Sequence, residues 1–270
     1  MSQHKAHFVL EKQGKLEIRP RLTPSPQQNQ ALVKITAAAI NPVDWKIIDY
    51  GIFVERFPAI LGTDGAGIIE AKTGIEFPTN GPTAIGKGVL ILGGSSSVGQ
   101  FAIQLARIAG FSPIVTTASV DHEAFLKSLG ATRIFDRNVD AKTIQSAFSS
   151  PVALAVDAIS VGSTQELAYE VLTTPSPVPS AHLALVRPLT DSIKEKNSGN
   201  KATVHNVLGI SHNDRDLSVP FWQNVGQWIK DGKFVPNRVQ VVGGLAALPE
   251  ALDVSRKGVS GVKIVIHPQE

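Results

Sequence analysis

The sequence predicts an α/β fold in which a doubly wound parallel sheet is inserted into a second, mostly β domain. Strand and helix patterns alternate over residues 84–233, whereas residues 1–83 contain mainly strand patterns and the chain ends in an apolar strand at Val262–His267. Such alternation is typical of a parallel sheet with helices on both faces. A closing strand needs a sheet edge to join, and the N-terminal strands offer one. We therefore expect a discontinuous domain of residues 1–83 and 234–270 around an α/β insert at residues 84–233.

The composition is that of a folded globular protein and argues against several classes of function. The 270 residues are 43% hydrophobic and 18% charged, and the net charge is only +3. Lysine and arginine are scattered singly, so no basic stripe for a nucleic acid is expected. The absence of cysteine excludes disulfides, thiolate nucleophiles and cysteine-based zinc sites. A polar N-terminus and the lack of any transmembrane-length apolar run predict a soluble, cytoplasmic protein without a membrane partner.

The N-terminal elements follow from alternating apolar residues separated by turn residues. Asn41-Pro42 should end a long strand, because proline lacks the backbone donor that a sheet needs. Residues 73–87 are loop-like, with two prolines and several glycines. The expected elements are a hairpin of His7–Glu11 and Lys15–Arg19, a strand at Ala31–Ile40, a short helix at Asp44–Tyr50 and a strand at Gly65–Ala71.

The central elements follow from short apolar runs that precede segments of helical periodicity. Strands are expected at Val89–Leu92, Pro113–Thr117, Arg133–Phe135, Ala153–Asp157, Ala181–Val186 and Ala202–Leu208, and helices at Val98–Ala109, His122–Leu129 and Gln165–Leu172. In the tail, the expected order is a helix at Pro220–Lys230, a strand at Val239–Val242, a helix at Pro249–Arg256 and a strand at Lys263–His267.

A turn rich in glycine and serine joins the first buried strand directly to a helix. Its residues are Gly93, Gly94, Ser95, Ser96, Ser97, Val98 and Gly99. Small residues let the backbone approach a pyrophosphate closely, and a helix N-terminus supplies free amides and a positive dipole end. The strict G-x-G-x-x-G spacing is absent, so the strand–turn–helix setting carries the prediction of a Rossmann dinucleotide site.

The residues of this turn allow two other interpretations. It could be a tight strand–helix turn that binds nothing. It could also be the nucleophile elbow of a hydrolase, G-x-S-x-G, but here Ser97 stands where that motif requires its last glycine. Three successive serines suit hydrogen bonding to phosphate better than they suit one strained nucleophile.

The end of the second strand of the insert favours NADP over NAD. NAD sites carry an acidic residue there for the ribose hydroxyls, whereas this strand ends Thr117-Ala118-Ser119, and the first carboxylate is Asp121. Small hydroxyls leave room for a 2′-phosphate. His122, Lys127 and Arg137 are candidates for its countercharge, although for each one alone an ordinary solvated side chain is the better explanation.

The chain resembles the medium-chain dehydrogenases/reductases of quinone oxidoreductase type, in the version seen in fungal trans-acting enoyl reductases. The segments that carry this resemblance span the chain from end to end: Ala38–Lys46, Leu61–Gly67, Val89–Phe111 with Ser128–Thr132, and Gly258–Val265. The resemblance implies a GroES-like catalytic domain around the Rossmann NADP-binding domain. It also implies nucleotide contacts from Leu208, Gly209 and Lys263.

The resemblance further implies a zinc-free site and a shortened catalytic domain. Zinc-using members place cysteine where Asn41 stands and histidine where Thr63 stands, so no metal is expected. Between Gly67 and Gly88 this chain has twenty residues, where the family has several tens more. The missing stretch usually completes the catalytic barrel, so its loss predicts an exposed apolar face and a homodimer over that face.

The candidate catalytic residues are Lys46, Tyr50 and Asn41. Many relatives carry a tyrosine proton donor where this chain has Phe53, so Lys46 and Tyr50 are the nearest substitutes. A solvated lysine, a packed tyrosine and a helix-capping asparagine are the plainer explanations of the three, and direct proton uptake from water is a further one. The predicted function is NADPH-dependent reduction of a quinone, an enone or an enoyl thioester on a polyketide carrier. The alternative is a non-catalytic nucleotide-binding paralogue or truncated variant.

Overall fold

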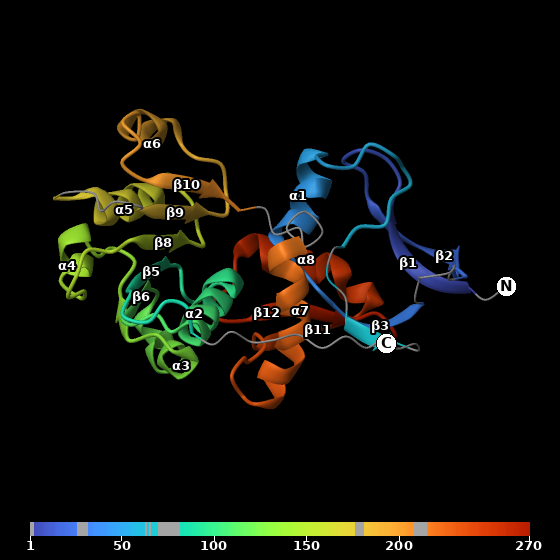
Figure 1. The fold of residues 1–270 in the computed structure, drawn as a ribbon. Coiled ribbons are helices and arrows are strands. Elements are labelled where there is room, and N and C mark those ends of the chain that lie inside the picture. The colour runs from blue at the N-terminus through green and yellow to red at the C-terminus, as the bar shows by residue number, and fades with distance from the viewer. Residues whose placement is uncertain are drawn as a thin grey trace. The chain divides into compact units, whose positions relative to one another are not determined.

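The computed structural model describes residues 3–25, 32–62, 64, 66–69, 82–175, 181–207 and 215–270. The chain divides into two compact units, Met1–Gly74 with Arg238–Glu270, and Ile75–Asn237. Each unit is described by itself below (Figure 1). The domain limits expected from the sequence, 83/84 and 233/234, stay a prediction.

The unit of residues 75–237 contains one six-stranded parallel sheet. Its spatial order is β10-β9-β8-β5-β6-β7. The first strand of the unit in sequence therefore lies centrally, between the second and the fourth, which is the order of a Rossmann sheet. The strands are β5 (Val89–Leu92), β6 (Ile114–Thr117), β7 (Arg133–Phe135), β8 (Leu154–Asp157), β9 (His182–Leu185) and β10 (Thr203–Asn206).

Helices cover both faces of this sheet because its central strand is apolar on both sides. Val89 and Ile91 of β5 belong to a core shared with α2 and α3, whereas Leu90 and Leu92 belong to a core shared with α4, α5 and α6. The short helices α4 and α6 were not expected from the sequence. The helices are α2 (Ser97–Ala109), α3 (Glu123–Leu129), preceded by a 3-10 turn at Val120–His122, α4 (Ala141–Gln145), α5 (Gly162–Thr173), α6 (Asp191–Lys196) and α7 (Arg215–Lys230).

The other unit is built from both ends of the chain. The closing strand β12 (Lys263–His267) pairs in parallel with β11 (Val239–Gly244) and antiparallel with β3 (Val33–Ala39). β4 (Ala66–Ile69) extends this sheet beyond β3, and β1 (Gln3–Val9) forms a separate hairpin with β2 (Leu16–Leu22). The closing strand thus joins the N-terminal sheet, as the sequence predicted.

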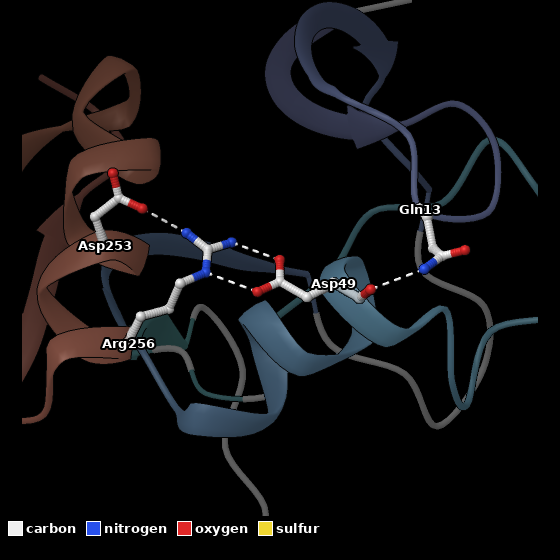
Figure 2. Close-up of polar contacts among 4 residues, drawn as sticks. All are labelled: Gln13, Asp49, Asp253 and Arg256. Carbon is white, nitrogen blue, oxygen red and sulfur yellow. Dashed lines mark hydrogen bonds and ion pairs between the residues drawn. The ribbon is translucent and has the colours of Figure 1, made fainter.

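Two helices pack against this sheet and are joined by an ion pair. Arg256 of α8 (Leu248–Lys257) donates from Nε and Nη2 to both carboxylate oxygens of Asp49, at 2.9 and 2.7 Å, in α1 (Pro42–Tyr50). Figure 2 shows that Asp253 also binds the guanidinium and that the Gln13 side chain donates to the backbone oxygen of Asp49. The C-terminal helix is thereby fastened to the N-terminal one. None of the helices in the described ranges is long and apolar enough to cross a membrane.

Candidate functional site

The glycine- and serine-rich turn leaves β5 at Gly93 and enters α2 after Ser96. Gly93 has a φ of +78°, which side chains rarely adopt, and a Cβ there would lie 2.5 Å from Ile159. A Cβ on Gly99 would collide with the backbone oxygen of Gly93. The Ser96 hydroxyl caps α2 by accepting from the Gly99 amide at 3.0 Å. Both glycines are therefore required for the close approach of strand, turn and helix.

The amides at the start of α2 are available to a ligand. Those of Ser97 and Val98 donate to no acceptor in the described part of the chain, as expected of a first helical turn. They carry the positive end of a 13-residue helix dipole. A pyrophosphate is an anion with several acceptor oxygens, so this small-residue cradle fits the phosphates of a dinucleotide. The predicted residues Gly93–Gly99 are all found in this turn.

A buried glutamine side chain stabilises the turn. Gln100 is 1% exposed, and its side chain donates to the backbone oxygen of Ser95 at 2.9 Å. It also accepts from the Asn237 side chain at 2.8 Å. Gln100 could not be found from the sequence, because its partner Asn237 is distant in the chain.

The carboxyl ends of β5 and β8 meet at the point where the strand order reverses, which is where ligands bind in open α/β sheets. Ile159 follows β8 and lies against Gly93. Its turn is held by Asp157, a fully buried carboxylate that accepts from the amides of Ile159 and Ser160 and from the Thr164 hydroxyl, at 2.7 to 3.0 Å. Burial is the main cause of the raised pKa of Asp157. This network was missed from the sequence.

The end of β6 forms the edge expected to hold the ribose. Thr117 is in place, since its hydroxyl accepts from the Gly93 amide at 3.1 Å. The Ser119 hydroxyl donates to Asp121 at 3.0 Å, so a carboxylate lies at this edge. A 3-10 turn at Val120–His122 keeps Asp121 beside Ser119.

The three candidate countercharges differ in their surroundings. Lys127 forms an ion pair with Glu123 at 2.6 Å. His122 is the half-buried last residue of the 3-10 turn. Arg137 is exposed two residues beyond the end of β7, which lies beside β6 through a 3.0 Å bond from Ala118 to Phe135. Arg137 is thus the cation whose position best suits a phosphate at this edge.

The other unit holds a polar cluster at the start of α1. The Lys263 ammonium donates to Asn41 Oδ1 and lies 3.6 Å from Asp64 Oδ2. The Asn41 side chain donates from Nδ2 to Asp64 Oδ2 at 2.8 Å, and the Asn41 backbone amide donates to Asp44 Oδ2 at 2.7 Å. Two predicted residues, Asn41 and Lys263, are thereby brought together. The sequence predicts a catalytic role for Asn41 and a nucleotide contact for Lys263, and their hydrogen bond shows that both belong to one local cluster.

The remaining predicted catalytic residues surround Trp45. The Lys46 ammonium lies 5.4 Å from the centre of the Trp45 ring, and the Tyr50 ring meets Trp45 edge-on at 6.1 Å. Tyr50 is 59% exposed and Phe53 is 81% exposed. Both rings are therefore accessible to a ligand, and the catalytic roles of Lys46 and Tyr50 stay predictions.

Three predicted positions, Leu208, Gly209 and Thr63, lie outside the described residues. Within the described ranges, no group of three or more histidine, aspartate or glutamate residues is arranged to hold a metal ion.

Known proteins match this chain over most of its length. Residues 27–111 match the alcohol dehydrogenase GroES-like domain, and residues 97–175 match the zinc-binding dehydrogenase family. A trans-enoyl reductase of Aspergillus flavipes is 26% identical over 351 residues, covering 98% of this chain and 99% of the relative. One from Aspergillus japonicus is 26% identical over 326 residues, covering 93% of each.

Solved structures share the fold. The quinone oxidoreductase of Coxiella burnetii superposes with a TM-score of 0.73 at 21% identity, covering 98% of this chain and 99% of that one. Together with the sheet order and the glycine turn, these matches define a Rossmann unit combined with a GroES-like unit. The chain belongs to the medium-chain dehydrogenase/reductase family.

Proposed function

We propose that this protein is an NADPH-dependent reductase of activated carbon–carbon double bonds or quinones. The observation that carries the proposal is the cradle of Gly93, Gly99 and the free amides of Ser97 and Val98 at the point where the strand order reverses. Relatives named reductases and dehydrogenases also favour an enzyme over a non-catalytic nucleotide-binding protein.

Each residue of the cradle has a definite task in the proposed reaction. The amides of Ser97 and Val98 would bind the pyrophosphate, while Thr117 and Gln100 hold the turn in shape. Ile159 would form an apolar wall beside the turn. Leu208, Gly209 and Lys263 are proposed as further nucleotide contacts from the family resemblance. The bound nicotinamide would supply the hydride.

The preference for NADPH rests on Ser119 and Arg137. Ser119 leaves space for a 2′-phosphate, and Arg137 offers the opposite charge. His122 is proposed as a further contact at this edge. Asp121 opposes this preference, because a carboxylate repels a phosphate and accepts from ribose hydroxyls. The cofactor preference is thus set by a balance between Arg137 and Asp121.

The proposed substrate class comes from the relatives. Trans-enoyl reductases from two Aspergillus species align over nearly the full chain, and a putative NADPH:quinone reductase of Bacillus thuringiensis has the same fold, with a TM-score of 0.74. We infer that the substrate is a quinone, an enone or an enoyl thioester, the last on a polyketide synthase carrier.

We also propose that the reaction needs no metal and that the protein forms a homodimer. Without cysteine, and with Lys263 bound to Asn41, a metal site at this place would have to displace an ammonium. Treatment with a chelator should therefore change neither turnover nor melting temperature, and stoichiometric zinc in purified protein would contradict this. Apolar side chains of the shortened unit, among them Val239 at 61% and Leu22 at 54% exposure, support a dimer over this surface.

The test is a fluorescence titration with NADPH and NADH, followed by turnover on a panel of quinones and enoyl thioesters. NADPH should bind at least about tenfold tighter than NADH, which is roughly 1.4 kcal/mol. Oxidation of NADPH should require the acceptor. Failure to bind either nucleotide would overturn the proposal, and equal affinities would overturn its choice of NADPH.

A further inference from the structure

The turn that follows β8, residues 158–161, is held by three buried polar side chains. Asp157, Ser160 and Gln165 are each at most 3% exposed. Asp157 accepts from the amides of Ile159 and Ser160 and from a threonine hydroxyl of α5. A carboxylate removed from water is costly unless its oxygen atoms are satisfied. The contribution of Asp157 therefore lies in the turn that it holds.

Ser160 has a backbone conformation that serine rarely adopts. Its φ is +53°, in the left-handed region. The Ser160 hydroxyl donates to the backbone oxygen of Asp157 at 2.7 Å and accepts from the backbone amide of Val186 at 2.9 Å. Strained conformations of this kind persist only where the surroundings hold them, and they cluster at ligand sites. The turn is thus fixed both to its own strand and to the end of β9.

Gln165 joins the same turn to the segment that follows β9. Its side chain donates to the backbone oxygens of Ser160 and Pro188, at 3.2 and 3.0 Å, and accepts from the amide of Thr190 at 2.9 Å. One amide group therefore connects the segments that leave β8 and β9 at the carboxyl edge of the sheet. This is the edge at which open α/β sheets bind their ligands.

The side chain positioned by this network is Ile159. It is 37% exposed, and its Cγ1 and Cδ1 atoms lie 2.5 Å from the place where a Cβ on Gly93 would be. Because β5 lies between β8 and β6, Ile159 borders the half of the crevice that is opposite the edge at Ser119. A buried network thus holds an exposed apolar side chain beside the glycine at which the proposed phosphate turn begins.

We propose that Asp157 and Ser160 are positioning residues that hold Ile159 in the crevice, where it supports the nicotinamide half of the bound NADPH. This inference rests on the proposed function. With the 2′-phosphate at Ser119 and the pyrophosphate at the turn after β5, the other half of the nucleotide reaches the β8 side of the sheet. Asp157 is fully buried, so it acts on the nucleotide through Ile159.

The test compares Asp157→Ala with Asp157→Asn. Alanine removes the three hydrogen bonds that the carboxylate accepts. Asparagine can keep all three positions filled, because its Oδ1 can accept from the amides of Ile159 and Ser160. Its Nδ2 can donate to the Thr164 hydroxyl, which also contacts the backbone oxygen of Val161 and can donate there instead.

The control is Asn197→Ala, at the opposite edge of the same sheet. The Asn197 side chain holds the loop before β10 by one bond to the amide and one to the oxygen of Ala202, at 3.0 and 2.9 Å. Its removal therefore also frees a loop of this unit, but at the amino ends of the strands. Asn197→Ala should bind nucleotides as the wild type does, even where its melting temperature is lower.

Calorimetric titration measures the affinities for NADPH and for 2′,5′-ADP, a fragment that has the adenosine half and the 2′-phosphate but no nicotinamide half. Asp157→Ala should bind NADPH about tenfold more weakly and 2′,5′-ADP within about twofold of wild type. Asp157→Asn should recover the NADPH affinity to within about threefold. Equal losses for the two ligands in Asp157→Ala, or unchanged NADPH affinity, would overturn the inference.

A double-mutant cycle tests whether Asp157 acts through Ile159. Ile159→Ala removes the apolar contact directly, so Asp157→Ala should add little to the loss of NADPH affinity that Ile159→Ala causes. Additive losses would overturn the inference.

Ser160→Gly gives the same test if Asp157→Ala does not fold. Glycine adopts a φ of +53° without strain, while the bonds of the hydroxyl to Asp157 and Val186 are lost. This variant should lose affinity for NADPH and keep its affinity for 2′,5′-ADP, and the opposite result would contradict the proposal. Failure of the wild type to bind NADPH would instead overturn the proposed function, and this inference with it.

Discussion

The two units of the chain differ in how completely their sheets are covered. In residues 75–237, both faces of one six-stranded sheet carry cores, of 16 and nine buried hydrophobic residues among those described. The other unit has sheets of four and two strands and a core of five such residues. Its strands β2, β3 and β11 carry exposed apolar side chains, among them Ile18, Val33 and Val241.

This difference agrees with the expectation that the chain is shortened in the unit of residues 1–74 and 238–270. The alignment with the Aspergillus flavipes relative spans 351 residues, more than the 270 of this chain, so the relative has residues that this chain lacks. The nucleotide-binding unit has a complete sheet without them. The other unit depends instead on β12, supplied from the far end of the chain, to connect β11 with β3.

The strongest way to break this comparison is to remove β12. Deleting residues 261–270 should unfold the unit of β1–β4, because β12 is the central connection of its sheet. A milder change is Ile264→Ala, which truncates a side chain that is only 1% exposed. It should lower the free energy of unfolding by about 2–5 kcal/mol. Val259→Ala, at 43% exposure, is the control and should have little effect.

Hydrogen exchange measured by mass spectrometry separates the two units. Protection should be lost in β3 and α1 and kept in β5 and α2. Equal loss of protection in both units would show that the nucleotide-binding unit is not independently stable.

The next largest effect should come from Gly99→Ala. The new Cβ would meet the backbone oxygen of Gly93, which cannot move without opening the turn. NADPH affinity should fall by about 100-fold, roughly 2.7 kcal/mol. The control is Gly226→Ala in α7, where a Cβ meets nothing within 4 Å. Wild-type affinity in the Gly99 variant, measured by fluorescence titration, would exclude the turn as the phosphate site.

A smaller effect concerns the choice of nucleotide. Ser119→Asp adds a second carboxylate beside Asp121 and should shift the NADPH-to-NADH affinity ratio toward NADH by about tenfold, or 1.4 kcal/mol. Asp121→Asn removes the opposing charge and should shift the ratio toward NADPH. If both variants shifted the affinity ratio in the same direction, the 2′-phosphate would have to bind at another site.

The smallest effect should be that of the ion pair between Arg256 and Asp49. Both side chains are about one third exposed, at 32% and 33%, so solvent screens their attraction. A double-mutant cycle with Arg256→Met and Asp49→Asn should give a coupling of about 0.5–1 kcal/mol that falls as salt is added. A coupling above 2 kcal/mol in urea unfolding would mean that this pair, rather than β12, holds the two chain ends together.

The parts of the fold that depend on local pattern could be predicted from the sequence. The apolar run Val89–Leu92 and the small residues after it specified the central strand and the cradle, because both depend on neighbours in the chain. The short helices α4 and α6 were missed, since five or six residues give too little periodicity to distinguish a helix from a loop.

The polar clusters could not be predicted because tertiary pairing creates them. Lys263 meets Asn41 only because β12 pairs with β3, more than 200 residues earlier in the chain. Asp121 reaches Ser119 because a 3-10 turn at Val120–His122 precedes the helix. The network of Asp157 had one local signal, a buried strand that ends in aspartate followed by Ser160 and Thr164.

Hydrogen exchange of the full-length protein with and without saturating NADPH tests the central claim most directly. If the turn between β5 and α2 is the nucleotide cradle, NADPH should slow exchange at the amides of Ser97 and Val98 and at the end of β6 around Ser119. NADH at the same concentration should protect them less. Protection confined to other segments, or no change with NADPH, would contradict the account.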